Sequence, residues 1–259
     1  MGSLEYFACG QTSHGMHRLL RGAEREQRVF PSGVFLYRDR DRRVLFDTGY
    51  APEPWGAGSA AWLYRRLLPP LIPPGATIGE RLPPESVTHV VLSHLHPDHV
   101  GGLTAFPDAE VVLSEGIART LAAPRLSQGV FRRLLPPDLL DRARVVADSE
   151  FVDDPVTGLR TADLFDDDSY QLVDLPGHAR GHVGALVDGR VLLAGDAAWG
   201  RSLLGEEHRL KPVPRAVADD AAAQAATALA LLAAERRGVR LLFSHDRHRE
   251  GVDLMQGGA

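Results

Sequence analysis

Four side chains of the kinds that bind metal ions lie within six residues, and this stretch constrains the chain more than any other. Residues His94–His99 read HLHPDH and directly follow the apolar run Thr88–Leu92. Side chains two residues apart at the end of a strand point the same way. His94 and His96 can therefore present two imidazoles to one metal ion.

The residues after these two histidines predict a second ion beside the first. Pro97 stops the strand, and the chain turns toward the glycine pair Gly101 and Gly102. The turn redirects Asp98 and His99, so that they can serve a second metal ion. A single histidine at a strand end is more often structural than a ligand. Three histidines and one aspartate at this spacing favour metal binding instead.

Further ligand types follow other apolar runs, where strand ends meet loops and functional side chains gather. The three candidates are His178 after Tyr170–Asp174, Asp196 after Val191–Ala194, and His245 after Val239–Phe243. The single cysteine, Cys9, excludes an internal disulfide and a cysteine-rich zinc site. Metal chemistry in this chain must therefore rest on histidine and carboxylate ligands.

Short apolar runs bounded by turn residues predict a chain rich in strands. The predicted strands are Val34–Tyr37, Val44–Asp47, Val87–Leu92, Glu110–Leu113, Tyr170–Asp174, Val183–Val187, Val191–Ala194 and Val239–Phe243. The dipeptide Asp188-Gly189 predicts a tight hairpin between two of them. The predicted helices are Ala60–Leu68, Glu115–Ala122, Leu126–Leu135 and Arg215–Arg237, and Ala51–Gly58 is a predicted loop. Such a pattern indicates sheets covered by helices, an α/β or α+β layered fold.

Composition excludes several classes of function. The net charge is −5, which argues against a nucleic-acid surface, since such surfaces carry a basic balance. No apolar run approaches the roughly 18 residues that a membrane span needs, and the N-terminus lacks the features of a signal peptide. We therefore expect a single domain over residues 1–259 in the cytoplasm, with no membrane or nucleic-acid partner.

The order of the motifs resembles that of the metallo-β-lactamase superfamily. Residues His94–His99 look like its HxHxDH signature, and Asp47–Gly49 resembles its first motif. His178, Asp196 and His245 match its third, fourth and fifth motifs in order. The resemblance implies an αββα sandwich, in which two sheets lie face to face with helices outside and the metals lie at one edge.

The resemblance also implies how the ligands divide between two divalent ions. The implied sets are His94, His96 and His178 for the first ion, Asp98, His99 and His245 for the second, and Asp196 as the bridge. Nitrogen-rich, partly open coordination suits zinc, with iron, manganese and cobalt as alternatives. Two such ions can hold a shared hydroxide that attacks a carbonyl group of a small-molecule substrate.

Several polar residues beside the ligands have expected roles of their own. In this superfamily the first motif is mainly structural, so Asp47 is expected to support the site rather than to bind metal. Asp246 either orients the preceding histidine or closes a turn. His182 is expected to be a structural turn residue. His14 and His17 are expected on the surface or in loops, and a place on the pocket wall is the alternative.

Within the superfamily, the chain is most similar to acyl-homoserine lactone lactonases. The similar stretches are Val191–Ala198 and Phe243–Asp246. In that branch a tyrosine three residues after the bridging aspartate helps to bind the substrate carbonyl, and here this position is Trp199. An indole N–H can donate one hydrogen bond but cannot act as a phenolic acid. Asp98 and Trp199 are the candidate catalytic residues.

The expected activity is hydrolysis of a lactone or ester by a metal-bridging hydroxide. A thioesterase similar to glyoxalase II, or a non-hydrolytic pathway enzyme on the same fold, is the alternative. A non-catalytic scaffold is disfavoured because the ligand set is complete. The sequence leaves the oligomeric state open, with a homodimer as one alternative.

Overall fold

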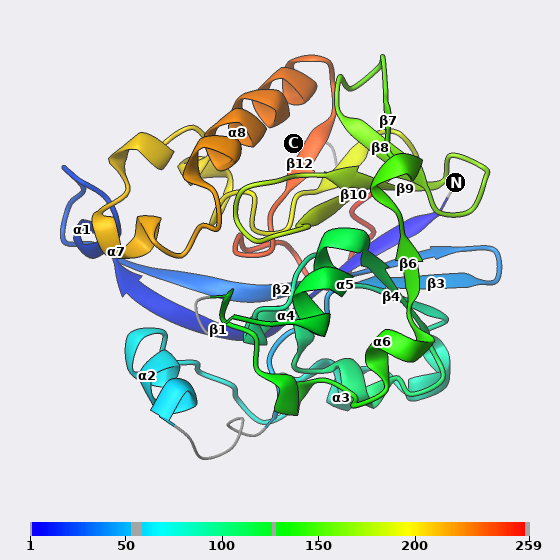
Figure 1. Ribbon diagram of the computed structural model, residues 1–259, viewed down its shortest axis with the longest axis horizontal. Helices are drawn as coiled ribbons and strands as arrows, with labels where there is room; N and C mark the ends of the chain where they lie inside the picture. The colour runs from blue at the N-terminus through cyan, green and yellow to red at the C-terminus, as the bar shows by residue number, and fades with distance from the viewer. Residues whose placement is uncertain (1, 53–58, 126–127, 257–259) are drawn as a thin grey trace.

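Two six-stranded sheets pack against each other in the computed structural model, which describes residues 2–52, 59–125 and 128–256 (Figure 1). The strand order is β1-β2-β3-β4-β5-β6 in the first sheet and β12-β11-β10-β9-β8-β7 in the second. Each sheet is therefore built from one continuous part of the chain. The predicted αββα sandwich of the metallo-β-lactamase fold is confirmed.

The first sheet combines an antiparallel and a parallel part. Pairing is antiparallel from β1 to β3 and parallel from β3 to β6. Its strands are β1 (Ser3–Gly15), β2 (Gln27–Asp39), β3 (Arg42–Phe46), β4 (His89–Val91), β5 (Glu110–Ser114) and β6 (Arg144–Val146).

The second sheet is antiparallel except at one edge. Pairing is antiparallel from β7 to β11, and β11 pairs with β12 in parallel. Its strands are β7 (Val152–Asp153), β8 (Arg160–Asp163), β9 (Tyr170–Asp174), β10 (Val183–Val187), β11 (Val191–Leu193) and β12 (Arg240–Leu242).

Most of the described helices are short and lie between strands. The α-helices are α1 (Met16–Leu19), α2 (Ser59–Leu67), α3 (Ile78–Arg81), α4 (Pro97–Val100), α5 (Glu115–Ala122), α6 (Leu139–Arg142), α7 (Pro212–Arg215) and α8 (Ala221–Arg236). Single 3₁₀ turns occur at Pro84–Ser86, Leu103–Ala105, Arg132–Leu134, Asp148–Glu150, Arg201–Leu203 and Glu207–Arg209. Within the described ranges, none of these helices has both the length and the apolar character needed to cross a bilayer.

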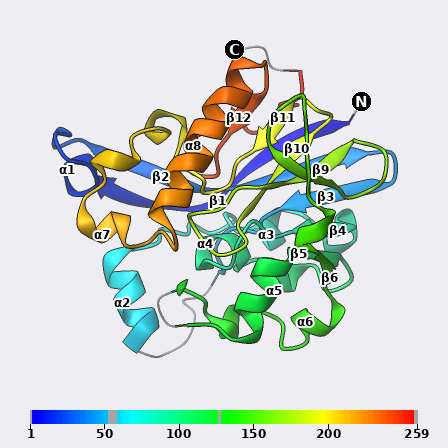
Figure 2. The same ribbon diagram turned by 45° about the horizontal axis from the view of Figure 1, so that its top comes forward.

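Two apolar layers hold the sandwich together. One lies between the sheets, where Leu36 and Leu45 of the first sheet share a core with Ala185 and Val187 of the second. The other lies outside the second sheet, where α8 contributes Leu231 to a separate apolar cluster. Figures 1 and 2 show α8 on one outer side of the sandwich and α3, α5 and α6 on the other.

All eight predicted strands are present, but β1, β6, β7 and β8 were missed, and β1 is the longest of these four. In β1 the buried positions begin by alternating, and the register then shifts between Ala8 and Gln11. An irregularity of this kind moves later side chains to the opposite face, so the strand has no continuous alternation to recognise. The predicted hairpin is confirmed, because Asp188 and Gly189 both have positive φ between paired residues Val187 and Val191.

Two of the predicted helices were wrong in extent. For Leu126–Leu135, residues 126–127 lie outside the described part, and the described remainder has 3₁₀ geometry at Gln128 and at Arg132–Leu134 but no α-helix. Gly129 has a φ of +65°, and an added Cβ would lie 2.9 Å from the His96 ring, so the chain turns there against the site. The predicted loop Ala51–Gly58 also falls mostly outside the described residues, from 53 to 58.

The predicted helix Arg215–Arg237 is in fact two helices, α7 and α8. Asp220 lies outside α8 as its N-cap, where its carboxylate accepts hydrogen bonds from the backbone N–H groups of Ala222 and Ala223 at 2.9 and 3.0 Å. An aspartate in this place satisfies N–H groups that a helix leaves without partners. The prediction had put this residue inside the helix.

Candidate metal centre

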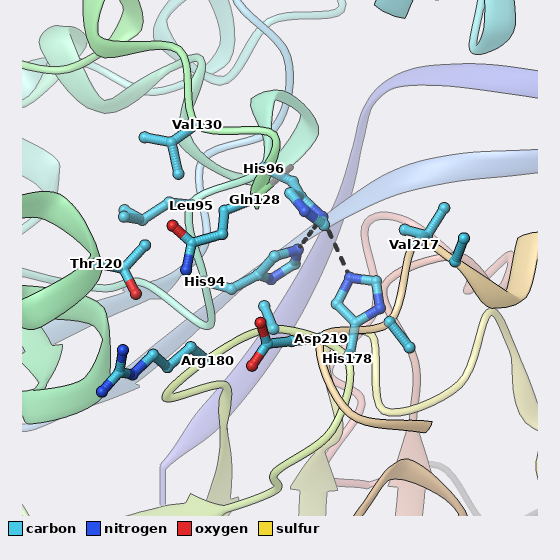
Figure 3. Close-up of a pocket in the computed structure, with 13 residues that line it drawn as sticks. His94, Leu95, His96, Thr120, Gln128, Val130, His178, Arg180, Val217 and Asp219 are labelled. Atoms are coloured by element: carbon cyan, nitrogen blue, oxygen red, sulfur yellow. Dashed lines mark hydrogen bonds between the residues drawn. The ribbon is translucent and has the colours of Figure 1, made fainter. Parts of the chain in front are cut away.

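The chain brings all seven predicted ligands to one edge of the sandwich. Each follows a strand end: His94 and His96 come after β4, Asp98 and His99 lie on α4, His178 follows β9, Asp196 follows β11, and His245 follows β12. Short connections after strands place these side chains where the two sheets meet. Figure 3 shows the imidazoles of His94, His96 and His178 turned toward one another.

The seven side chains form three overlapping groups whose ligand atoms lie within 4.8 Å of one another. The groups are His94, His96 and His178; His94, His99 and Asp196; and Asp98, His99 and His245. Asp196 contacts members of different groups. Its Oδ2 lies 3.0 Å from His245 Nε2 and 3.4 Å from His178 Nε2, and its Oδ1 lies 3.4 Å from His99 Nε2.

The donor set fits metal ions. His94 Nε2 and His178 Nε2 lie 2.9 and 3.2 Å from the same atom, His96 Nδ1, as the dashed lines of Figure 3 mark. His99 Nε2 and Asp196 Oδ1 are buried without a hydrogen-bond partner of good geometry among the described residues. Burying unsatisfied polar atoms is costly, and nitrogen-rich sites with a carboxylate suit zinc and related ions.

Asp47 supports the centre through His99. Its Oδ2 lies 2.7 Å from His99 Nδ1 and accepts the Ser93 hydroxyl, and its Oδ1 accepts the Ser93 backbone N–H at 2.8 Å. A proton on His99 Nδ1 leaves Nε2 to face the ligand groups. Asp47 belongs to none of the three groups, in agreement with the expected supporting role.

His245 is oriented by the backbone and not by its neighbour. Its Nδ1 lies 2.7 Å from the Pro31 carbonyl oxygen. The Asp246 carboxylate accepts instead from the backbone N–H of Arg201 at 2.7 Å and from the Arg28 guanidinium at 3.2 Å. The Asp246 side chain therefore does not orient His245; its backbone N–H closes a turn onto the Phe243 carbonyl at 3.2 Å, and its carboxylate joins two other segments.

His182 supports Asp196 from behind. It is fully buried; its Nδ1 lies 2.9 Å from the Leu175 carbonyl oxygen, and its Nε2 accepts the Asp196 backbone N–H at 3.1 Å. Gly195, with a φ of +53°, lets the chain pass this ring, since an added Cβ would lie 2.7 Å from His182 Nε2. His182 is thus a positioning group in the structure and not a member of a ligand group.

The pKa values of two histidines of the centre, His94 and His99, are shifted in opposite directions. Burial lowers the pKa of His94 well below its usual value, and His99 and His96 lower it further, so His94 is a neutral imidazole. Burial also lowers the pKa of His99, but the carboxylates of Asp196 and Asp47 outweigh burial and hold that pKa well above its usual value. The carboxylates therefore create a field that favours positive charge beside them.

Comparison with known proteins identifies the family. The sequence profile of the metallo-β-lactamase superfamily matches residues 28–245. The chain belongs to the metallo-β-lactamase superfamily. Among curated members, "Probable metallo-hydrolase Rv2300c" of Mycobacterium tuberculosis is 31% identical over 198 residues, which are 71% of this chain and 62% of that protein. The match thus spans less than two thirds of that relative's length.

Other similar proteins carry lactonase names. "N-acyl homoserine lactonase AiiB" of Agrobacterium fabrum is 34% identical over 93 residues, 33% of each chain. A solved N-acyl homoserine lactone hydrolase, with N-hexanoyl-L-homoserine at its catalytic metal centre, has a TM-score of 0.71 at 17% identity and covers 94% of this chain and 93% of its own. The structure of AidC, described as a dizinc quorum-quenching lactonase, has a TM-score of 0.63 at 14% identity, covering 94% and 87%. At these identities the two solved structures share the fold alone.

In this member of the superfamily, a cavity of about 150 Å³ opens beside His94, His96 and His178 (Figure 3). Its wall is mixed. The polar lining residues are Thr120, Gln128, Arg180 and Asp219, and the larger apolar ones are Leu95, Val130 and Val217. No pattern in the sequence marked the polar group, because its members come from four separate segments.

Trp199 lies beside the centre but in a different cavity. It lines a smaller space of about 20 Å³ together with His178, and it packs on an apolar cluster that includes Leu203. As far as the described residues define it, the wall of the larger cavity does not include Trp199. The catalytic role that the sequence suggests for Trp199 therefore stays a prediction.

Of the two N-terminal histidines, His14 is separated from the ligand His245 by the ring of Phe30. The ring centroid of His14 is 6.1 Å from that of Phe30, which in turn is 6.3 Å from that of His245. His17 lies on α1. Neither lines the larger cavity as the described residues form it.

Two tyrosines, the buried Tyr50 and the half-buried Tyr64, lie near the ligand Asp98, and sequence reasoning missed both. The Tyr64 hydroxyl lies 3.5 Å from Asp98 Oδ1 and is hydrogen-bonded to Tyr50. Burial raises the pKa of each phenol well above its usual value, and the Asp98 carboxylate raises it further. Both are therefore neutral hydrogen-bonding groups at neutral pH.

Proposed function

We propose that this chain is a two-metal hydrolase that opens a small-molecule lactone or ester. The observation that carries the proposal is Asp196, whose carboxylate lies within 3.4 Å of His178, His99 and His245 and so links the ligand groups. A buried carboxylate surrounded by imidazoles on several sides is suited to bridging two cations. The family membership agrees with this reading.

The proposed ligand division follows two of the three groups, and the third, which joins His94, His99 and Asp196, lies between them. His94, His96 and His178 would hold the first ion, Asp98, His99 and His245 the second, and Asp196 both. Zinc suits this donor set. When bound, two such ions activate water and polarise a carbonyl group.

The chain's own residues supply the remaining chemistry. Hydrolysis joins the water oxygen to the carbonyl carbon, breaks the acyl carbon–oxygen bond and puts a proton on the leaving oxygen. The Asp98 side chain is 13% exposed, whereas that of Asp196 is 3% exposed. Asp98 is therefore the carboxylate that is better placed to pass a proton to the leaving oxygen, and Trp199 is a candidate donor beside His178.

The lactone or ester class has support from similar proteins. AiiB is named a lactonase, and a solved enzyme of the same fold holds an acyl-homoserine product at its metal centre. The mixed polar and apolar wall of the larger cavity suits a small molecule with a carbonyl group and an apolar part. A thioester remains the alternative substrate class.

The direct test combines metal analysis with a substrate screen. The purified chain, loaded with zinc at neutral pH, is analysed for metal and assayed against matched lactones, esters, thioesters and phosphodiesters. We expect about two ions per chain and hydrolysis of lactones or esters. A chain that takes up no metal would contradict the proposal, and preferred hydrolysis of thioesters would transfer it to the alternative class.

Alanine substitutions at proposed ligands and at histidines outside the ligand groups then test the ligand division. His96→Ala and Asp196→Ala should abolish hydrolysis and lower metal content, because both residues lie in ligand groups. His182→Ala and His14→Ala should keep most of the metal, although loss of a supporting residue can still cost about 10–100-fold in affinity or activity. Equal metal loss in all four variants would refute the assignment.

A further inference from the structure

The lactonase-like branch has a phenol where this chain has Trp199, yet a phenol reaches the centre from another element. Tyr64 lies on α2, and its hydroxyl lies 3.5 Å from Asp98 Oδ1. The indole of Trp199, by contrast, lines the smaller cavity. The structure thus places a phenolic group at the half-buried carboxylate of Asp98 without using the position of Trp199.

The two oxygens of Asp98 have different partners. Oδ2 lies 3.7 Å from His99 Nε2 and 3.7 Å from His245 Nε2, so it faces the second ligand group. Oδ1 faces Tyr64 instead. When one carboxylate oxygen accepts a hydrogen bond from a hydroxyl group, only the other oxygen is presented to an ion. The carboxylate then binds the ion through a single oxygen atom.

The Tyr64 hydroxyl is itself held in place. Tyr50 is buried, donates its backbone N–H to the Cys9 carbonyl at 3.1 Å and hydrogen-bonds the Tyr64 hydroxyl. The Tyr64 ring packs edge-on against Phe131, with ring centroids 5.5 Å apart. A single phenolic proton serves one acceptor best. The Tyr64 hydroxyl gives its proton to Asp98, and the Tyr50 hydroxyl is its phenolic neighbour.

We infer that Tyr64 is the positioning residue of this centre: held by Tyr50, it fixes Asp98 so that Oδ2 alone faces the second ion. The inference rests on the proposed two-metal function.

The test measures metal binding separately from turnover. Cobalt is titrated into wild type, Tyr64→Phe and Tyr50→Phe, and the visible absorption of the second ion, chelator competition, kcat and KM are recorded. We expect Tyr64→Phe to lower the affinity for the second ion by about 10-fold. Such a loss is within the range seen when residues that support metal ligands are removed. Its absorption should change, kcat should fall more than KM rises, and the first ion should be unaffected. Tyr50→Phe should act in the same direction with a smaller effect.

Matched controls separate this role from a general loss of packing. Tyr37→Phe removes a phenol that donates to Asp188 at 2.9 Å, far along the chain from the centre, and should leave both ions unchanged. In an Asp98→Ala background, Tyr64→Phe should have no further effect on the second ion. Tyr50→Phe tests the same chain of hydrogen bonds should Tyr64→Phe fail to fold.

The two proposals fail in different ways. A wild-type chain that binds a single ion overturns the two-metal function and this inference with it. A wild type that binds two ions, beside a Tyr64→Phe variant with the same second-ion affinity and absorption within twofold, overturns the inference alone. An equal effect of Tyr64→Phe in the presence and absence of the Asp98 carboxylate also overturns it.

Discussion

Hydrogen bonds behind the histidines decide which ring nitrogen each one turns toward the centre. His99 gives its Nδ1 to the Asp47 carboxylate, and His245 gives its Nδ1 to a backbone carbonyl, so both present Nε2. His182 has the same orientation but uses its Nε2 to accept the backbone N–H of Asp196. Rings fixed in this way lose little freedom when they bind an ion, which favours binding.

The neutral state of His182 predicts a pH-dependent contribution to stability. Burial lowers the pKa of His182 in the folded chain below its usual value of 6.5. The unfolded chain then binds more protons, so the contribution is fully present above about pH 6.5 and is lost as the pH falls from there toward the folded-state pKa. His182→Gln keeps an acceptor for Asp196 but does not titrate.

Urea unfolding of both proteins at pH 7.5 and pH 5.5 checks this. The free energy of unfolding of wild type, relative to that of His182→Gln, should be lower at pH 5.5 than at pH 7.5. Protonation of the other histidines occurs in both proteins and cancels in the comparison. A relative stability that rises toward low pH would show that His182 is buried as the charged form.

Trp199 offers a second prediction at this scale. Trp199→Phe keeps an apolar ring beside His178 and removes the indole N–H, and Trp199→Tyr restores a phenol. A donor used in the transition state shows as a joint fall in kcat and kcat/KM. We expect that fall for Phe with metal content unchanged, and a gain in any weak lactonase activity for Tyr. A change confined to KM or to melting temperature would indicate packing in the smaller cavity.

At the scale of elements, the start of α8 holds the loop that carries His178. The backbone N–H groups of Asp219 and Asp220 donate to the carbonyls of His178 and Gly177 at 3.0 and 2.9 Å. Thr227, on the same helix, donates its hydroxyl to the Pro176 carbonyl at 2.7 Å. The helix that covers the second sheet is therefore also a support of the metal centre.

Removing the cap of this helix should destabilise the chain measurably. Asp220→Ala deletes the carboxylate that accepts from Ala222 and Ala223, and losses of such caps typically cost about 1 kcal/mol. Asp219→Ala is the matched control, since its carboxylate caps none of the described helices. Urea denaturation should show the loss for the first variant only, and equal losses would mean that the cap contributes nothing of its own.

The sequence predicted which polar residues come together at the centre better than it predicted the elements around them. Each ligand follows a strand rich in apolar residues, and both the run and the polar residue after it are local signals. Tyr64 gives no such signal, because its approach to Asp98 depends on how α2 packs across a long stretch of chain. Leu126–Leu135 has helical spacing, yet Gly129 turns the chain against His96. Local patterns predict which side chains follow strands, whereas long-range packing decides what surrounds them.

At the scale of the whole molecule, the centre joins the two sheets. The first sheet's part of the chain supplies His94, His96, Asp98 and His99, and the second sheet's part supplies His178, Asp196 and His245. The two sets of ligands come together only in the folded chain, so ions bound by both sets would link the two sheets in that state alone. Binding to the folded state alone stabilises it, by about 4 kcal/mol at a ligand concentration 1,000 times Kd.

Chelation should therefore lower the melting temperature, and added zinc should restore it. The matched variant is Asp196→Ala, which lacks the bridging carboxylate and should respond to chelator less than wild type. Differential scanning calorimetry with and without chelator measures both. A melting temperature of wild type that chelator leaves unchanged would show that the sheets are held by their apolar layer alone.

The strand order has a consequence for dividing the chain. Because each sheet uses consecutive strands, a cut between β6 and β7, near the 3₁₀ turn Asp148–Glu150, leaves one fragment with β1–β6 and another with β7–β12. Neither fragment carries more than part of the ligand set. Turnover after the two fragments are mixed would show that they have associated. The chain could therefore serve as a split-protein reporter, because activity requires both fragments.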